Sequence, residues 1–322
     1  MKILVTGGAG YIGSFMVRRL IDDGHEVVIA DSLERGDAAS LDERASFEKG
    51  SLLDKDYLTR LFNSYTFDGV IHFAGYISVG ESVEKPELYF ANNFLASVNL
   101  LDQMVESKVR NIIFSSTAAV YGNPKVIPIP EDHPKDPESP YGDSKWMIER
   151  VLQWYHKSYD LSYVALRYFN ASGAALDGSL GETHDPETHI IPNAIKAALE
   201  KNSFTLFGTD YPTKDGTCVR DYIHVLDLAQ AHVLALKKIT DAKGGYAFNV
   251  GTGNGYSKEI LDMVQKVSGV SIDIKKETRR EGDPNELIAD VTKIKNELGF
   301  SPQHSDLETI VSSAWKWHSQ KA

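Results

Sequence analysis

The sequence predicts an α/β fold, in which a parallel sheet is wound with helices on both faces. Three observations lead to this prediction. A glycine-rich turn at residues 7–13 follows a short apolar run, further apolar runs alternate with helix-compatible stretches, and Tyr141 precedes Lys145 by four residues. Apolar runs separated by helices pair as parallel strands, and ligands bind at the carboxyl ends of such strands.

The bulk composition indicates an ordinary globular protein. The chain has 322 residues, of which 42% are hydrophobic and 25% charged, enough for one large domain or two closely joined ones. Its net charge of -11 argues against sequence-independent nucleic-acid binding. The single cysteine, Cys218, excludes an intrachain disulfide and suits a reducing compartment. With neither a signal peptide nor a membrane-length apolar window in the sequence, we expect a cytoplasmic protein without membrane partners.

The first predicted strand, residues 2–6, leads into the glycine turn and then into a helix that runs to Leu20. Glycines at 7, 10 and 13 give the tight turn, the close approach of a pyrophosphate and the packing of helix on strand, while the helix N-terminus supplies amides to the anion. The second strand, residues 26–31, ends in Asp31. This carboxylate is suited to accept hydrogen bonds from ribose hydroxyls and to repel a 2′-phosphate, which favours NAD over NADP. The prediction is a Rossmann-type, doubly wound sheet.

Four more strands continue the alternation, at residues 69–75, 111–117, 162–168 and 246–251. Because parallel strands end at the same edge of the sheet, we expect Ala74, Gly75, Thr117 and Tyr168 to meet in one crevice. Asn92, in the helical stretch after Pro86, is a further candidate there.

Tyr141 and Lys145 fall one helical turn apart, which places both side chains on one face and lets the ammonium stabilise a phenolate. Among 15 tyrosines, roughly one such pair is expected by chance. A second pair, Tyr121 and Lys125, is separated by Pro124 and cannot share a helix. Residues 140–152 can stay helical, so Tyr141 and Lys145 indicate redox chemistry.

Eight motifs in order carry a family resemblance over nearly the whole chain. They are TGGAGYIGS (6–14), HFAG (72–75), VGES (79–82), FSSTAAVYG (114–122), YGDSK (141–145), RYFN (167–170), VRDYIHV (219–225) and RREGD (279–283). The chain thereby resembles the UDP-glucose 4-epimerases of the extended short-chain dehydrogenase/reductase family.

The resemblance implies an NAD-dependent isomerase that interconverts UDP-galactose and UDP-glucose in galactose metabolism, through a transient 4-keto sugar and enzyme-bound NADH. Tyr141 would be the acid and base, Lys145 would bind the nicotinamide ribose and lower the tyrosine pKa, and Thr117 would hydrogen-bond the 4-hydroxyl. A phenolate at neutral pH needs a shift of about 3 pKa units, or roughly 4 kcal/mol. Lys145 and the oxidised nicotinamide are the cations expected to supply it.

The expected contacts divide between cofactor and substrate. Cofactor contacts are Gly7, Gly10, Tyr11, Ile12, Gly13, Asp31, Ser32, Ser51, Leu52, Phe73, Ala74, Gly75, Asn92, Ser115, Tyr141, Lys145, Tyr168 and Phe169. Substrate contacts are Thr117, Tyr141, Asn170, His189, Phe207, Arg220, Arg280, Asp283 and Leu287. The two arginines would hold the diphosphate, Phe207 would lie near uracil, and Asp283 would bind the uridine ribose.

A cluster of Glu182, His184, Asp185, Glu187 and His189 combines imidazole and carboxylate groups within eight residues. The cluster lies in a polar loop containing Pro186, matches no ligand pattern, and the implied chemistry needs no metal. We therefore predict no metal site.

The predicted domains are discontinuous. An NAD-binding domain takes residues 1–170 and 221–254, and a smaller nucleotide-sugar lobe takes 171–220 and 255–322. The resemblance also suggests a homodimer.

Two positions depart from the family pattern at the expected cofactor site. Ser51 replaces a common aspartate and Ile77 a common lysine, which puts tight NAD retention in doubt. At the substrate site, Leu287 is intermediate between the bulky and small residues of relatives, so UDP-N-acetylhexosamines (UDP-GlcNAc and UDP-GalNAc) and UDP-pentoses remain alternative substrates.

Other activities on the same scaffold are less favoured. A nucleotide-sugar dehydratase would carry an Asp-Glu pair where this chain has Ala118 and Ala119. A net dehydrogenase would use the same triad and would release reduced cofactor. A non-catalytic NAD-binding protein would be expected to lose Tyr141 or Lys145.

Overall fold

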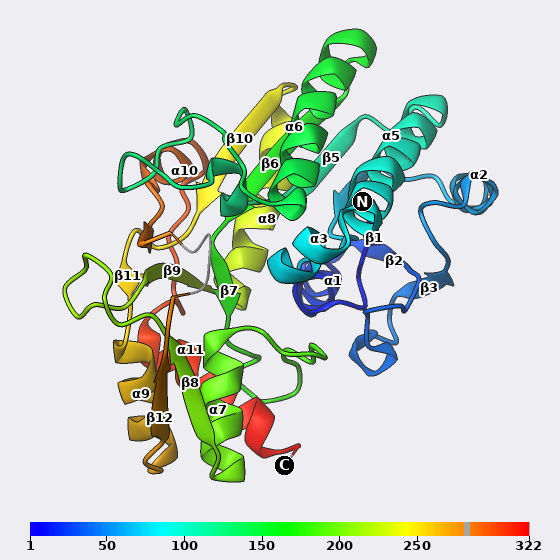
Figure 1. Cartoon of the computed structure of the whole chain (residues 1–322). Helices are drawn as coiled ribbons and strands as arrows, with labels where there is room; N and C mark the ends of the chain where they lie inside the picture. Colours follow the sequence, from blue (N-terminus) through cyan, green and yellow to red (C-terminus); the bar gives the residue numbers. More distant parts are fainter. Residues whose placement is uncertain (280–283, 322) are drawn as a thin grey trace. The chain divides into compact units, whose positions relative to one another are not determined.

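The computed structural model describes residues 1–279 and 284–321 (Figure 1). It divides into two compact units, each made of several segments. The first contains residues 1–123, 134–167 and 229–248, and the second contains 124–133, 168–228 and 249–322.

A seven-stranded sheet follows the order β10-β6-β5-β4-β1-β2-β3. Pairing is parallel between β1 and β2, β2 and β3, β1 and β4, and β4 and β5. The strands are β1 (Lys2–Thr6), β2 (Glu26–Asp31), β3 (Ser46–Lys49), β4 (Gly69–His72), β5 (Asn111–Thr117), β6 (Ser162–Tyr168) and β10 (Gly245–Val250). This order reverses at β1, the arrangement of a doubly wound nucleotide-binding sheet. The predicted fold class is confirmed, and β3 is the one strand of this sheet that the sequence pattern did not predict.

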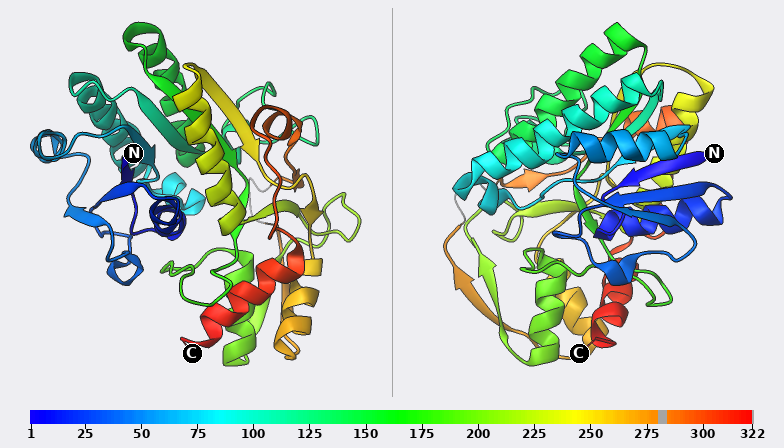
Figure 2. Two further views of the ribbon diagram at one scale, coloured as in Figure 1. Left: turned by 180° about the vertical axis from the view of Figure 1, so that it is seen from behind. Right: turned by 90° about the vertical axis from the view of Figure 1, so that its right-hand side faces the viewer.

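Helices cover both faces of this sheet. The helices are α1 (Tyr11–Asp22), α2 (Lys55–Ser64), α3 (Val79–Glu84), α4 (Pro86–Tyr89), α5 (Ala96–Glu106), α6 (Pro140–Tyr159) and α8 (Val225–Asp241), with a π-helical turn at Phe90–Leu95 and 3₁₀ turns at Ala38–Ser40 and Ala118–Tyr121. Helices α2, α5 and α6 enclose one core against the strands, while α1 and α8 lie on the opposite face (Figure 2). Strands such as β5 are buried over almost their whole length because both faces are covered.

The second unit is built around β9 (Val219–His224), which pairs with β7 (Asn170–Ser172), β11 (Gly255–Tyr256) and β13 (Glu286–Leu287). Strands β8 (Ser203–Phe207) and β12 (Asp273–Glu277) form a separate parallel pair. Helices α7 (Ile190–Glu200), α9 (Glu259–Ser268) and α11 (Leu307–Ser319) pack around a common apolar core, and α10 (Thr292–Leu298) completes the unit.

The division differs from the predicted boundaries at residues 124–133, 168–170, 221–228 and 249–254, which belong to the second unit. Hydrogen bonds explain part of the difference. The amide of Ile129 donates to the carbonyl oxygen of Ile288 at 2.8 Å, and the side-chain amide of Asn249 donates to the backbone carbonyl oxygen of Ile129 at 2.7 Å. Such pairings between distant segments leave no mark on local sequence patterns. None of the helices in the described part of the chain has the length and apolar character needed to cross a membrane.

Candidate active site

The turn between β1 and α1 forms a backbone cradle that only glycine permits. Gly7 has φ +73°, and a Cβ there would come within 2.5 Å of the Ala74 nitrogen. At Gly13 a Cβ would stand 2.1 Å from the carbonyl oxygen of Gly7. Gly10 is the N-cap of α1, so no side chain covers the first amides of the helix. These amides and the helix dipole suit an anionic pyrophosphate, and the cradle therefore fits a dinucleotide.

Asp31, at the end of β2, anchors this turn. Its Oδ2 accepts a 3.0 Å hydrogen bond from the Ala9 amide and its Oδ1 a 2.9 Å bond from the Leu33 amide. Each carboxylate oxygen has a second lone pair, which leaves capacity for the predicted ribose contact. The neighbouring Ser32 accepts a bond from the Glu34 amide at 3.4 Å.

Three successive residues at the end of β5 contact one face of α6. The carbonyl oxygen of Ser115 accepts a 2.8 Å hydrogen bond from Lys145 Nζ, Ser116 Oγ donates to Glu149 at 2.5 Å, and Thr117 is hydrogen-bonded to the Tyr141 hydroxyl. Tyr141, Lys145 and Glu149 are spaced by four residues and so share this face. The sequence predicted the first two members, and the structure brings them together with Thr117.

Helix α6 begins where its sequence directs. Ser139 is the N-cap and accepts a hydrogen bond from the Gly142 amide at 3.2 Å, and Pro140 occupies the first turn. Tyr141 thus lies in the first turn of the helix, one turn before Lys145.

Burial acts on both titratable groups of the pair. It lowers the pKa of Lys145 to about 8, and it raises the pKa of Tyr141, although the hydrogen bond with Thr117 acts in the opposite direction. The sequence interpretation expected a lowered tyrosine pKa with the oxidised cofactor bound. Within the chain itself the direction is the reverse, because desolvation disfavours the phenolate.

The loop after β4 is held by a residue that sequence reasoning missed. Buried Asn93 accepts a 2.8 Å hydrogen bond from the Tyr76 amide and donates to the Tyr76 carbonyl oxygen at 2.9 Å and to Ser144 Oγ at 3.3 Å. It thereby ties the segment after Gly75 to α6. The predicted Asn92 only donates to Asn93, at 3.4 Å. The available sequence signal was that Asn93 and Ser97 are four residues apart, so both polar side chains lie on one helix face. Ser97 Oγ lies 2.7 Å from His72 Nε2.

The other predicted cofactor contacts lie on surrounding elements. Phe73 and Ala74 donate backbone bonds to the carbonyl oxygen of Thr6 at 2.9 and 3.1 Å, while Tyr11 and Ile12 begin α1. Leu52 is buried in the core beneath α2 and α5. Ser51 accepts a 3.3 Å bond from the Leu53 amide, and the side chain of Ile77 is exposed.

Four predicted substrate residues line one cavity of about 530 Å³ in the second unit, namely Asn170, His189, Phe207 and Arg220. The side chain of Asn170 donates to the Asp221 carbonyl oxygen at 3.0 Å, and Arg220 donates to the carbonyl oxygens of Val219 and Pro284, both at 2.9 Å. Leu287 pairs with Arg220 between β13 and β9.

The remaining predicted residues lie elsewhere. Tyr168 is buried at the end of β6, and the amide of Phe169 donates to the Val250 carbonyl oxygen at 3.4 Å. Arg280 and Asp283 fall outside the described residues.

The fold and the glycine cradle define a protein of the dinucleotide-binding class, in which Tyr141, Lys145 and Thr117 meet where β5 ends. The family model described as "NAD dependent epimerase/dehydratase family" matches residues 3–251. The chain belongs to the NAD dependent epimerase/dehydratase family, and the predicted family resemblance and NAD cofactor are confirmed.

Similar proteins match over the full length. The chain is 48% identical to a UDP-glucose 4-epimerase of Streptococcus mutans, over 99% of this chain and 97% of that protein. It is 46% identical to one of Lactobacillus helveticus, with the same coverage. The crystal structure of the Brucella ovis UDP-glucose 4-epimerase with NAD is 45% identical, with a TM-score of 0.94 over 98% of this chain and 97% of that chain.

Proposed function

We propose that this protein is a UDP-glucose 4-epimerase that uses NAD to interconvert UDP-galactose and UDP-glucose. The observation that carries the proposal is the contact of Thr117 with Tyr141, and of Ser115 with Lys145, where β5 meets α6. The carboxyl end of β5 and the glycine cradle, which follows the carboxyl end of β1, lie on the same side of this parallel sheet. The names of the full-length relatives support the same reaction.

The residues of the site supply binding and proton transfer. NAD held by the glycine cradle would supply reversible hydride transfer at C4 of the sugar. Tyr141 takes the proton of the 4-hydroxyl as the hydride leaves, and gives it back when the 4-keto group is reduced. Thr117 orients that hydroxyl by hydrogen bonding, and Lys145 contributes the positive charge that favours the phenolate. The 4-keto sugar has to rotate so that its other face meets the cofactor, while the UDP part stays bound. We assign the UDP part to Asn170, His189, Phe207 and Arg220. Arg280 and Asp283 are assigned to the diphosphate and the uridine ribose on the family pattern alone.

Ala118 and Ala119 argue against a dehydratase. They begin the 3₁₀ turn directly after Thr117, and Ala118 is buried. Neither side chain can act as the acid or base that water elimination requires.

The substrate range is the finer question. A UDP-Glc/GlcNAc 4-epimerase from Campylobacter jejuni is 38% identical, with a TM-score of 0.86 over 99% of each chain. UDP-N-acetylglucosamine is therefore the first alternative substrate to test. Leu287→Tyr is tested beside it, because a bulkier side chain at the position that we assign to specificity should restrict the substrates to unmodified hexoses.

A homodimer and a cytoplasmic location are further parts of the proposal. They rest on the family resemblance and on the single cysteine, and light scattering of the purified protein tests the dimer.

The decisive experiment incubates the protein with UDP-galactose without added NAD and follows both UDP-glucose and free reduced nicotinamide. Interconversion without net reduction supports an epimerase that retains its cofactor. Activity only after NAD is added supports the epimerase and assigns weak retention to Ser51 and Ile77. Net formation of reduced nicotinamide would contradict an epimerase, and failure under both conditions would remove UDP-galactose as a substrate.

A further inference from the structure

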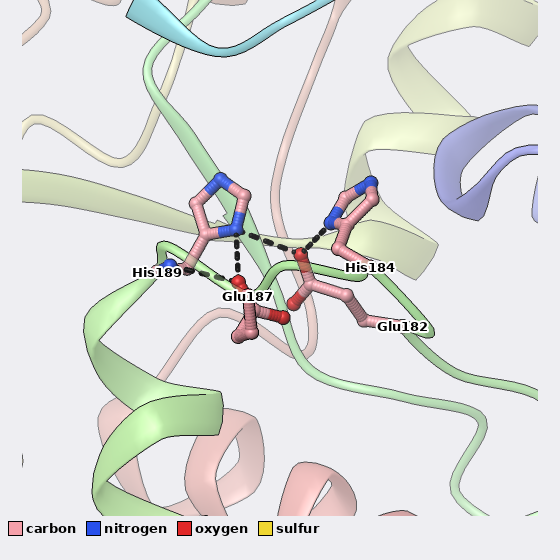
Figure 3. A group of neighbouring side chains, drawn as sticks. All are labelled: Glu182, His184, Glu187 and His189. Atoms are coloured by element: carbon pink, nitrogen blue, oxygen red, sulfur yellow. Dashed lines mark hydrogen bonds and ion pairs between the residues drawn. The ribbon is translucent and has the colours of Figure 1, made fainter. Parts of the chain in front are cut away.

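The loop before α7 gathers four potential metal ligands that the epimerase reaction does not use as a set. They are Glu182, His184, Glu187 and His189 (Figure 3). Glu182 Oε1 lies 2.6 Å from His184 Nδ1 and 2.9 Å from His189 Nδ1, and Glu187 Oε1 lies 2.8 Å from His189 Nδ1. One donor atom from each side chain falls within 4.8 Å of all the others. Asp185, which the sequence placed in the same cluster, is not part of this group.

The chemistry of the four donors matches a borderline divalent ion. Two imidazole nitrogens and two carboxylate oxygens are a donor set that zinc accepts in four-coordinate sites. Two carboxylates balance the charge of one divalent cation. Around an ion bound at about 2.0–2.2 Å, neighbouring donors stand roughly 3–3.5 Å apart. The three ion-pair separations of 2.6–2.9 Å would have to open by less than about 1 Å, and the remaining donor pairs, which lie within 4.8 Å of one another, would have to settle into the same range.

Burial makes a positive partner necessary. Only 5% of Glu182 is exposed, and a buried carboxylate is costly unless it is paired or bound to a metal. Figure 3 shows that His184 and His189 turn the same ring nitrogen, Nδ1, toward the carboxylates. The other three ligands, His184, Glu187 and His189, are only partly buried, so an ion has a route to the group.

We propose that Glu182, His184, Glu187 and His189 form a binding site for a divalent transition-metal ion of the zinc type. The site adjoins the cavity of the second unit, because Glu182 and His189 also line that cavity. This proposal differs from the expectation drawn from sequence alone, in which the absence of a matching ligand pattern and of any need for a metal in the implied chemistry argued against a metal site. The spacing is irregular because the ligands belong to a loop, and only the folded loop turns their donor atoms inward.

A proton is the competing occupant of this site. Burial opposes the charge of His189, but its hydrogen bonds to Glu182 and Glu187 raise its pKa. In the metal-free protein a protonated His189 can therefore bridge the two carboxylates. The experiment has to distinguish an ion site from a purely internal ion-pair network.

The test uses the tag-free full chain, stripped with a chelator and desalted. Co²⁺ is titrated while visible absorption is followed, Zn²⁺ is then added as competitor, and bound metal is counted by mass spectrometry after gel filtration. We expect one ion per chain and a cobalt spectrum of tetrahedral intensity that zinc abolishes. His184→Gln and Glu187→Gln should each weaken binding by about tenfold or more. His25→Gln, which removes a partly exposed imidazole in the first unit, should leave binding unchanged.

Two results would overturn the proposal. One is binding well below one ion per chain. The other is equal weakening by His184→Gln and His25→Gln, which would mean scattered surface binding. Thermal unfolding of each metal-free variant identifies any that is misfolded. Because His184 and Glu187 are only partly buried, at least one variant is expected to remain folded and decide the question.

Discussion

Ser116 donates a 2.5 Å hydrogen bond to the carboxylate of Glu149, which lies on α6 one helical turn after Lys145 and on the same helix face. Glu149 is also paired with buried Arg167, whose Nη2 lies 2.6 Å from Glu149 Oε2. Arg167 in turn donates to the Tyr121 hydroxyl at 2.8 Å. A buried polar network therefore links α6 to β5 and β6 one helical turn beyond Lys145.

Removing Glu149 should destabilise the first unit strongly. Glu149→Ala leaves the buried charge of Arg167 without its carboxylate, a change that costs about 3–5 kcal/mol of unfolding free energy. Urea denaturation followed by circular dichroism measures the effect. The matched control is Glu106→Ala, at the exposed end of α5. Equal stability of the two variants would show that Glu149 and Arg167 do not act as a buried pair.

Tyr141→Phe should abolish most turnover while the fold is kept. The phenyl ring retains the packing, but the group that exchanges a proton with the 4-hydroxyl is lost, so kcat should fall by about 10²–10⁴-fold. The control is Tyr159→Phe, an exposed tyrosine at the other end of the same helix. Rates of UDP-galactose conversion decide the comparison. A fall of less than tenfold would assign the proton transfer to another group.

The sequence predicted most of the first unit because its strands are continuous apolar runs. The predicted strands at 2–6, 26–31, 111–117 and 162–168 agree with β1, β2, β5 and β6. Strand β3, Ser46–Lys49, was missed because Phe47 is its one apolar residue and because it lies partly exposed at an edge of the sheet. The apolar run at 69–75 forms a strand only to His72, since Phe73 and Ala74 turn to bond Thr6.

Site residues were predictable where the chemistry is local. The glycine turn, Thr117 and the Tyr141–Lys145 pair follow from spacing or motif. Asn93 and Glu149 were missed because their roles depend on partners 17 to 51 residues away in the chain, and neither residue type indicates such a role by itself.

The pH dependence of activity should report on Lys145. Its pKa of about 8 means that the ammonium is present below this pH and is lost as pH rises through it. Activity should therefore decline above about pH 8. Stability should not decline with it: this group has an ordinary pKa of 10.5, so between about 8 and 10.5 the unfolded chain binds more protons than the folded one. Through this group, folding becomes more favourable as pH rises in that interval.

Lys145→Arg separates the two effects. Its guanidinium stays charged over this range, so the variant should be slower but should lack the decline near pH 8. Initial rates between pH 7 and 9.5, with circular dichroism at each pH, provide the measurement. Parallel declines in both proteins would assign the transition to a different group.

The glycine cradle should be the most sensitive part of the cofactor site. In Gly13→Ala the new Cβ would stand 2.1 Å from the Gly7 carbonyl oxygen, a distance that forces the β1–α1 turn to move. The displaced amides at the start of α1 can then no longer converge on a pyrophosphate. Gly80→Ala, in α3, is the matched control because its Cβ would meet nothing within 4 Å. Fluorescence titration with NADH should show at least about tenfold weaker binding for Gly13→Ala, equal to roughly 1.4 kcal/mol, and no change for Gly80→Ala. Unchanged affinity in Gly13→Ala would mean that the turn relaxes without losing its anion-binding amides, and that the cofactor is held mainly by Asp31 and the residues at the ends of β4 and β5.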